Sequence, residues 1–193
     1  MQVSLITIDD FYSDVDEVRQ LALQQSFDVE GNYPGRRTQS FINDSIKEII
    51  QSLILPHAGE ITWWGGEYSG AYQYTTKHDK SWIHADHTSN WAGVVYLTPN
   101  APPSGGTGFF KHKEMGLSEA VYKEDGSYDD DTMSQVYQDS QNYDKWEMTD
   151  QVSNKYNRLI LYRGNKFHQS LDYFGDNIYN GRLFQTFFFN TEF

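Results

Sequence analysis

The fold is decided by a short stretch, Ala92-Gly93-Val94-Val95-Tyr96-Leu97, and by the glycine-rich turn that follows it, Ser104-Gly105-Gly106-Thr107-Gly108. A short run of β-branched and aromatic residues that ends at turn-forming residues favours a β-strand. From about Ile61 onward, similar runs recur on both sides of this stretch. Such repetition is typical of a barrel or a sandwich. We therefore expect a mainly β protein.

About eight strands are predicted in this part of the chain, which is enough for two facing sheets. They cover residues 61–64, 70–75, 81–86, 92–97, 106–112, 157–162, 166–171 and 182–190. A further strand is predicted over residues 3–8. Apolar residues at helical spacing predict helices over 13–22 and 44–55, with Pro56 ending the second one. These helices are expected to flank and support the sheets.

The chain of 193 residues is long enough for one domain with a single core. We expect residues 1–60 to form a supporting strand and helices, and residues 61–190 to form the β core. An acidic segment, residues 114–150, interrupts that core with eleven acidic side chains against two lysines. Its composition indicates a solvated insertion or a partly disordered flap. The alternative is an acidic lid that selects a cationic substrate.

Charge and composition exclude several classes of partner. The formal net charge of -12 argues against nucleic acid and against an anionic membrane surface. The chain has no cysteine, so any transition metal must be held by imidazole and carboxylate groups. No leader and no stretch of membrane-spanning length is evident, so the expected location is the cytoplasm. A small molecule or a peptide remains as the expected substrate, and the oligomeric state cannot be read.

Two distant segments carry the residue types of a metal site. Ile83-His84-Ala85-Asp86 and Phe167-His168 supply two imidazoles and one carboxylate. Side chains alternate along a strand, so His84 and Asp86 are expected to face the same way, and His168 would complete the site. Three such ligands leave coordination positions open, as non-heme Fe(II) oxygenases require. Arg182, at the start of the last strand, carries the planar cation that binds a carboxylate through two hydrogen bonds.

With these residues in this order, the chain resembles the Fe(II)/2-oxoglutarate-dependent dioxygenase superfamily, and within it the prolyl-hydroxylase-like branch. The likeness covers roughly residues 71–190. It implies a double-stranded β-helix (jelly roll) core and an enzyme that uses Fe(II), 2-oxoglutarate and O2. The implied reaction is hydroxylation of a C–H bond in a small molecule, an amino acid or a peptidyl residue, with release of succinate and CO2.

The same resemblance implies a role for each matching residue. His84, Asp86 and His168 match the metal ligands, which are also the catalytic residues. Arg182 matches the basic residue that binds the distal carboxylate of 2-oxoglutarate. The interval from His168 to Arg182 is longer than in close prolyl hydroxylases, and residues 172–180 look like an inserted loop.

Three further residues match the co-substrate pocket of this superfamily. Tyr96 is similar in position to a tyrosine whose hydroxyl meets the distal carboxylate, and Tyr74 matches another pocket tyrosine. Thr186, on the same strand face as Arg182, would add a hydroxyl near it. The paired arginines Arg36 and Arg37 follow a turn-forming segment that is a plausible lip of the site. They are expected to face solvent, unless one of them meets an anionic group of the substrate.

Two other functions remain open from the sequence. One is a non-catalytic β-sandwich binding module that keeps the fold without the activity. The other is a metal-dependent enzyme that does not use 2-oxoglutarate, such as a zinc hydrolase. The opposite charges of the arginine pair and the acidic segment would suit a zwitterion such as an amino acid.

Overall fold

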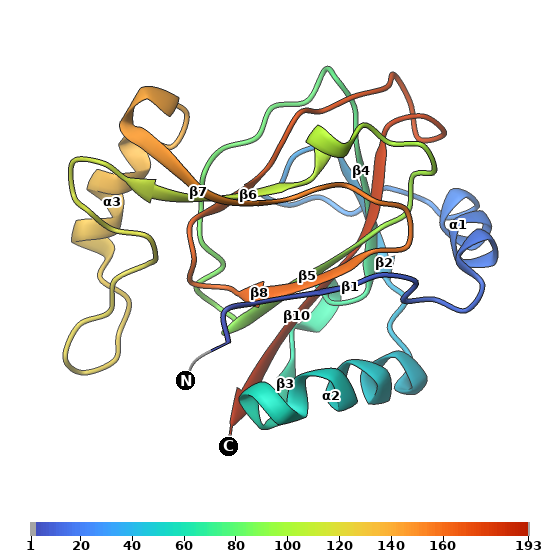
Figure 1. The fold of residues 1–193 in the computed structure, drawn as a ribbon, viewed down its shortest axis with the longest axis horizontal. Helices are drawn as coiled ribbons and strands as arrows, with labels where there is room; N and C mark the ends of the chain where they lie inside the picture. The colour runs from blue at the N-terminus through green and yellow to red at the C-terminus, as the bar shows by residue number, and fades with distance from the viewer. Residues whose placement is uncertain (1–2, 193) are drawn as a thin grey trace.

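The computed structural model describes residues 3–192, apart from the side chain of Glu67, and folds them as two antiparallel β-sheets with three α-helices (Figure 1). The predicted fold class, mainly β with flanking helices, is confirmed. None of these helices has both the length and the apolar composition that a membrane crossing requires.

The larger sheet has seven strands, and the long strand β10 lies inside it. Its strands are β1 (Leu5–Ile8), β2 (Arg36–Ser40), β3 (Glu60–Trp64), β4 (Ala71–Thr75), β5 (Trp91–Tyr96), β8 (Leu159–Arg163) and β10 (Arg182–Glu192). The hydrogen-bonded order is β1-β8-β5-β10-β4-β2, and β3 pairs with the far end of β10. Strands from both ends of the chain therefore build one layer.

The smaller sheet has three strands and faces the larger one (Figure 1). Its strands are β6 (Thr107–His112), β7 (Trp146–Val152) and β9 (His168–Ser170), in the order β7-β6-β9. Apolar side chains from both layers meet between the sheets: Val94 on β5, Phe109 on β6 and Val152 on β7 are buried in one cluster. The β core is thus a two-layer structure with an interior that both sheets share.

Two helices cover the outer face of the larger sheet. Ala22 of α1 (Val15–Leu23) and Ile50 and Ile54 of α2 (Asp44–Ala58) are fully buried against it. The prediction that Pro56 ends the second helix is wrong. The missing N–H of a proline removes one hydrogen bond, which the last turn tolerates, and the helix continues to Ala58 and is capped by Gly59, whose φ of 82° favours glycine.

The acidic segment is folded, which corrects the expectation of a partly disordered flap. It contains α3 (Asp130–Gln138) and β7, which pairs with β6 along its length. Met133 and Val136 of α3 are buried in one cluster with Trp146 and Phe167. Its acidic side chains therefore lie on the solvent side of a segment that has its own apolar core.

Residues 81–86 do not form the predicted strand. The only ladder contact of this segment, within the described residues, is an isolated bridge between His84 and His168. Its other backbone hydrogen bonds go to separate places: the N–H of Ile83 donates to the carbonyl of Ser140, and that of Asp86 donates to the carbonyl of Gly164. A segment whose backbone bonds are divided in this way crosses between elements instead of joining one sheet.

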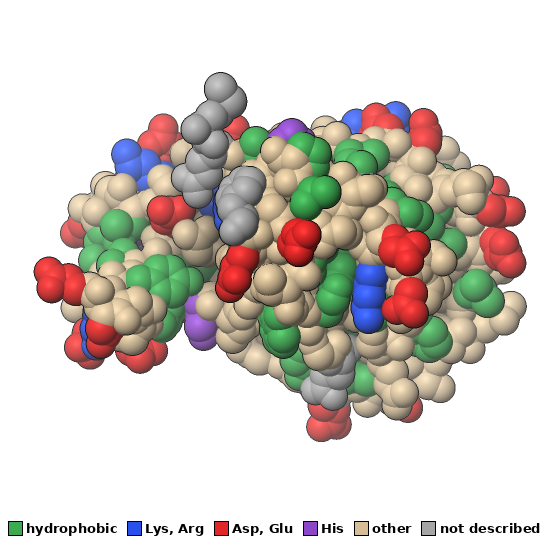
Figure 2. Space-filling model, turned by 90° about the horizontal axis from the view of Figure 1, so that it is seen from below, with side chains coloured by type: hydrophobic (Ala, Val, Ile, Leu, Met, Phe, Trp, Pro, Cys, Tyr) green, Lys and Arg blue, Asp and Glu red, His purple; other side chains and the backbone are tan. Residues whose placement is uncertain are grey.

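The surface agrees with the composition of the chain. Figure 2 shows the face seen from below, where acidic side chains are spread widely and basic ones are few. Apolar side chains such as Ile49 and Leu55 on α2 are partly exposed, at 44% and 47%. We find no concentration of positive charge on this face that would suit a polyanion.

Candidate metal centre and its cavity

Three ligand-bearing residues meet between the two sheets. His84 and Asp86 lie in the segment that follows β4, and His168 is the first residue of β9. The bridge between the two histidines consists of two backbone hydrogen bonds, of 3.1 and 2.8 Å. One ligand atom from each of the three residues lies within 4.8 Å of the others. The structure therefore brings together all three metal ligands predicted from the sequence.

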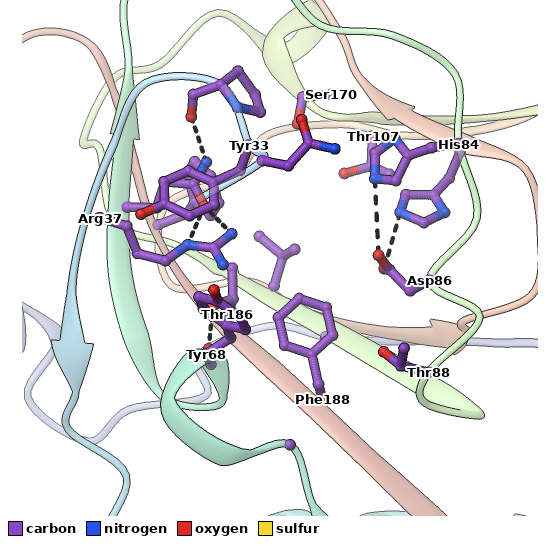
Figure 3. Close-up of a pocket in the computed structure, with 18 of the residues that line it drawn as sticks. Tyr33, Arg37, Tyr68, His84, Asp86, Thr88, Thr107, Ser170, Thr186 and Phe188 are labelled. Atoms are coloured by element: carbon purple, nitrogen blue, oxygen red, sulfur yellow. Dashed lines mark hydrogen bonds and ion pairs between the residues drawn. The ribbon is translucent and has the colours of Figure 1, made fainter. Parts of the chain in front are cut away.

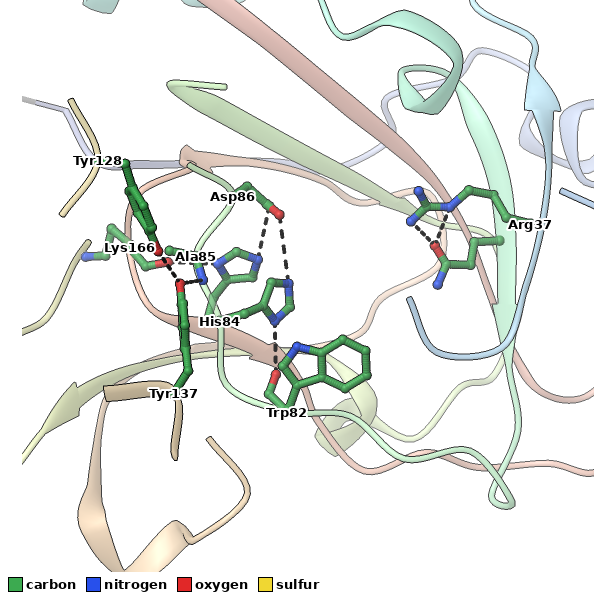
Figure 4. Close-up of polar contacts among 10 residues, drawn as sticks. Arg37, Trp82, His84, Ala85, Asp86, Tyr128, Tyr137 and Lys166 are labelled. Atoms are coloured by element: carbon green, nitrogen blue, oxygen red, sulfur yellow. Dashed lines mark hydrogen bonds and ion pairs between the residues drawn. The ribbon is translucent and has the colours of Figure 1, made fainter. Parts of the chain in front are cut away.

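Main-chain carbonyls orient both imidazole rings (Figure 4). The Nδ1 atom of His84 lies 3.0 Å from the carbonyl oxygen of Trp82, and that of His168 lies 2.8 Å from the carbonyl oxygen of Lys166. Because a carbonyl only accepts, Nδ1 donates in each ring, which leaves Nε2 as the atom that can bind a metal ion. The Nε2 atoms lie 3.9 Å (His84) and 3.2 Å (His168) from the carboxylate oxygens of Asp86. The donor atoms thus face one another.

The charges around Asp86 suit a metal site. Burial alone would raise the pKa of Asp86, but the attraction of His168, His84 and Arg37 outweighs it and leaves that pKa below the usual value. Burial lowers the pKa of His84, and the neighbouring His168 lowers it further. At neutral pH the site therefore offers a charged carboxylate and, at His84, a neutral ring, which are the forms that bind a metal ion.

This donor set fits a mononuclear Fe(II) ion. Two imidazole nitrogens and one carboxylate oxygen are the ligands of the facial triad, and a second hydrogen bond on each imidazole is the usual support of a metal ligand. No thiolate is present, which disfavours a closed structural zinc site. His84, Asp86 and His168 thus supply the ligand set that a mononuclear Fe(II) site requires.

The three ligands open into a cavity of about 640 Å³ that lies between the sheets (Figure 3). The larger sheet contributes Val94, Phe184, Thr186 and Phe188, and the smaller sheet contributes Thr107 and Ser170. Aromatic side chains complete the wall, namely Trp63 of β3 and, from segments outside the sheets, Tyr33, Tyr68 and Trp82. Polar side chains such as Asn32, Gln73 and Ser81 also line it, so the cavity offers both an apolar surface and several groups that could orient a ligand.

Arg37 is the one basic side chain among the described residues that line this cavity. It is 7% exposed, and burial lowers its pKa to about 10. Its Nε and Nη2 donate to Oε1 of Gln73, at 2.9 and 2.5 Å, and its guanidinium lies over the ring of Tyr33. Figure 3 shows Arg37 and Asp86 on opposite sides of the cavity. The expectation that both paired arginines face solvent holds for Arg36 and is wrong for Arg37.

Arg182 lies behind the cavity wall and not in it. Its Nε donates to the carbonyl of Gly105 at 2.9 Å, its Nη2 donates to that of Gly106 at 3.5 Å, and Phe184 covers its guanidinium at 4.3 Å. Its Nη1 is buried and has no hydrogen-bond partner among the described residues. A carboxylate would satisfy such an orphan donor. The wall residue Phe184 separates it from the cavity.

The other predicted co-substrate residues fall in three different places. Thr186 lines the cavity, and its hydroxyl donates to the carbonyl of Tyr68 at 2.9 Å. Tyr96 is fully buried beside Arg182, and its hydroxyl hydrogen-bonds Oγ1 of the wall residue Thr107 at 2.8 Å. Tyr74 faces the opposite side of the larger sheet, where its ring packs on Phe27, which corrects its assignment to the pocket.

Sequence reasoning missed the residues that surround Arg37. Gln73 is its hydrogen-bond partner, and Tyr68 is the second ring near its guanidinium, at 5.1 Å. Strand alternation was the available signal, since Gln73 precedes Tyr74 and must face the other side of β4. The pairing of β2 with β4 places Arg37 directly opposite Gln73, and no local pattern reveals that register.

Comparisons with known proteins place this geometry in context. The family described as Family of unknown function (DUF6445) matches residues 1–189 of the chain. No curated protein matches it in sequence. Solved structures give the informative likenesses.

One similar structure is HygX from Streptomyces hygroscopicus with nickel, 2-oxoglutarate and hygromycin B bound, with a TM-score of 0.62 and 11% identity over 100% of this chain and 84% of HygX. A second is a prolyl hydroxylase from Trichoplax adhaerens with a hypoxia inducible factor peptide fragment, with a TM-score of 0.54 and 15% identity over 96% of this chain and 83% of that one. A third is SnoK, a non-heme alpha ketoglutarate dependent carbocyclase from nogalamycin biosynthesis, with a TM-score of 0.59 and 10% identity over 97% and 80%. The chain thus has the jelly-roll fold of the 2-oxoglutarate-dependent oxygenases, as the resemblance implied.

Proposed function

We propose that this chain, which belongs to the DUF6445 family of unknown function, is an Fe(II)- and 2-oxoglutarate-dependent oxygenase. One observation carries the proposal: ligand atoms of His84, Asp86 and His168 lie within 4.8 Å of one another at a cavity between the sheets. The shared fold supports it, because HygX of the same fold binds nickel and 2-oxoglutarate. Fold alone does not assign an activity, so the proposal depends on the site.

The three ligands would hold Fe(II) from one side and leave the other side open. When bound, the metal and 2-oxoglutarate supply the oxidising power for attack on a C–H bond with O2, and the co-substrate leaves as succinate and CO2. Asp86 occupies the position that a halide would need, so the proposed outcome is hydroxylation. Val94 and Phe188 keep the adjoining wall apolar and limit the access of water.

Arg182 is the proposed partner for the distal carboxylate of 2-oxoglutarate. Its unpaired Nη1 supports this role, and the neighbouring Tyr96 and Thr107 would add hydroxyl groups. Phe184 lines the cavity and covers the guanidinium of Arg182, so a carboxylate in the cavity would reach Arg182 only if Phe184 turned aside. Thr186 is proposed to contact the co-substrate from the same sheet face.

The proposed substrate is a small molecule or a peptide side chain. HygX and the Trichoplax enzyme, which have this fold, bind hygromycin B and a peptide fragment respectively. The proposed location is the cytoplasm, whose reducing conditions keep iron ferrous. The division into N-terminal support, β core and acidic insertion, all in one domain, also stays a proposal.

The test is spectroscopic and uses the full chain. Anaerobic addition of Fe(II) and 2-oxoglutarate should produce the weak visible absorption band of the metal–ketoacid chelate, and O2 should then convert 2-oxoglutarate to succinate. His84→Ala should abolish the band, whereas His78→Ala, at an exposed histidine, should keep it. A wild-type protein that takes up neither the metal nor 2-oxoglutarate contradicts the proposal.

One observation favours a second candidate, a metal-dependent reaction without 2-oxoglutarate. Arg182 does not line the cavity, so the co-substrate has no cation in direct reach at that end. A metal-loaded protein whose absorption spectrum and thermal stability do not respond to 2-oxoglutarate would favour this candidate.

A further inference from the structure

Arg37 is a buried cation with no acidic partner among the side chains that the structure describes. Its side chain is 7% exposed, and no carboxylate that the structure describes forms an ion pair with it. Asp86 influences its charge from across the cavity, beyond ion-pair distance. An unpaired buried charge is unfavourable unless a ligand completes its surroundings. An anion bound at this end of the cavity would therefore compensate the charge of Arg37.

The side chain of Arg37 is held in one orientation. Nε and Nη2 share Oε1 of Gln73, and the amide nitrogen of Gln73 donates to the carbonyl of Pro34 at 2.6 Å. The ring of Tyr33 lies 3.9 Å from the guanidinium carbon, and that of Tyr68 lies 5.1 Å from it. The remaining nitrogen, Nη1, makes no hydrogen bond to a described residue, and the guanidinium points toward the cavity in Figure 3. A fixed planar cation with a free edge is a preorganised carboxylate receptor.

Composition of the wall narrows the class of anion. Arg37 is the single basic residue among the described lining residues, whereas a phosphate usually draws several donors. Two tyrosine rings lie beside Arg37, and Trp63 and Phe188 add apolar surface to the same cavity, which Asn32 and Gln73 also line. A single carboxylate on an apolar body fits these surroundings best.

From this geometry we infer that the substrate is a carboxylic acid with an apolar body, whose carboxylate is bound by Arg37 and whose reacting carbon lies toward His84, Asp86 and His168. The placement of the reacting carbon near the metal ligands rests on the proposed function. Two carboxylates then have two separate cations, because Arg182 is assigned to 2-oxoglutarate and Arg37 to the substrate. Both lie on the larger sheet, at the starts of β10 and β2.

The experiment compares carboxylic acids with their neutral amides. Monocarboxylic acids of two to ten carbons, including 3-phenylpropanoate, and the matched primary amides are titrated into the protein loaded with Co(II) and 2-oxoglutarate, with binding followed by ligand-observed NMR. At least one acid should bind about 10-fold more tightly than its amide, as one charge-assisted pair predicts. Arg37→Gln should erase this preference, and Arg36→Gln, at the exposed neighbour, should keep it.

A second variant guards against misfolding of the first. Gln73→Glu keeps the size of the side chain but places a carboxylate on Arg37, so it too should erase the preference. The absence of any acid-over-amide preference in the wild type overturns the inference. So does an Arg37→Gln protein whose affinity for 2-oxoglutarate falls about 10-fold while the preference remains, because Arg37 would then hold the co-substrate.

Repeating the titrations on metal-free protein separates the two proposals. Arg37 and Gln73 contact each other and not the metal ligands, so the acid preference should persist without metal. A persistent preference in a protein that never binds Fe(II) and 2-oxoglutarate refutes the oxygenase and leaves the carboxylate receptor. Loss of the preference in the loaded and the metal-free protein alike refutes the receptor alone.

Discussion

The metal end and the arginine end of the cavity are built in opposite ways. At the metal end, main-chain carbonyls orient both imidazoles, and a backbone bridge joins the two segments that carry them. At the arginine end, side chains do this work, since Gln73 and two tyrosine rings hold Arg37. In the proposed oxygenase the metal chemistry would therefore depend on the backbone, whereas the choice of substrate would depend on a few exchangeable side chains.

The largest effect should come from breaking the metal end alone. Asp86→Ala removes the carboxylate that faces both imidazoles, and loss of a direct ligand should weaken Fe(II) or Co(II) binding by at least about 100-fold. The acid preference at Arg37 should survive. Isothermal titration with Co(II) measures the first result, and Asp130→Ala, at an exposed residue of α3, is the control. Comparable metal affinity in both variants would remove Asp86 from the site.

The second largest effect should come from Arg182, the cation that lies behind the cavity wall. Arg182→Gln keeps a donor for the carbonyl of Gly105 but loses the guanidinium, so affinity for 2-oxoglutarate should fall about 10- to 100-fold. Titration of the visible chelate band gives this affinity. Arg37→Gln should leave the same titration unchanged, which keeps the two arginines distinct. If Arg182→Gln lowers only thermal stability, its role is structural.

A matched pair of variants tests the comparison directly. Gln73→Leu removes the side chain that orients Arg37, and should weaken binding of the preferred acid by about 10-fold. Trp82→Leu changes a side chain beside His84 but keeps the carbonyl that orients its ring, so metal affinity should stay within about 2-fold. The contrast fails if Trp82→Leu impairs the metal site as strongly as Gln73→Leu impairs the acid site.

The smallest effect should arise at an ion pair of the sheet edge, away from both ends. Asp9 accepts hydrogen bonds from Arg158 and Lys155, at 2.7 and 2.8 Å, and these hold its pKa well below the usual range. A lowered carboxyl pKa adds stability above the unfolded value of about 4, and this contribution is lost as the pH falls toward the folded value. Because Asp9 is 36% exposed, the contribution should stay under about 1 kcal/mol.

Urea unfolding measures this contribution. Asp9→Asn should lower the free energy of unfolding slightly at pH 7, and the difference from the wild type should narrow below about pH 4 as the carboxyl group is protonated. Metal binding and acid binding should not change. A change in either would show that the two ends of the cavity are sensitive to distant perturbation.

The metal ligands could be predicted because their residue types carry the chemistry. That pattern predicts His84, Asp86 and His168, but the strand over residues 81–86 that was expected to turn His84 and Asp86 the same way does not form. The bridge to β9 provides the convergence instead. A prediction of metal ligands from residue types does not depend on the correct secondary structure, because only a few residue types bind a metal through nitrogen and oxygen.

The arginine end could not be predicted, because the surroundings of Arg37 depend on the register between β2 and β4. Arg37 follows a glycine- and proline-rich turn, and alternation on β2 exposes Arg36 while it buries Arg37. Only the pairing of β2 with β4 reveals that Gln73 accepts the hydrogen bonds of Arg37. The fold of the acidic segment could not be predicted for a related reason. Met133 and Val136 are two apolar residues among many charges, and the residues they pack against lie elsewhere in the chain.

The carbonyl oxygens that hold the two imidazoles have a consequence for divergence. Every residue presents a main-chain carbonyl oxygen, so the side chains two positions before each histidine can be exchanged without loss of these two contacts. A centre anchored in this way tolerates wide drift in the surrounding sequence. It can persist in proteins that have come to share almost nothing else but their backbone path.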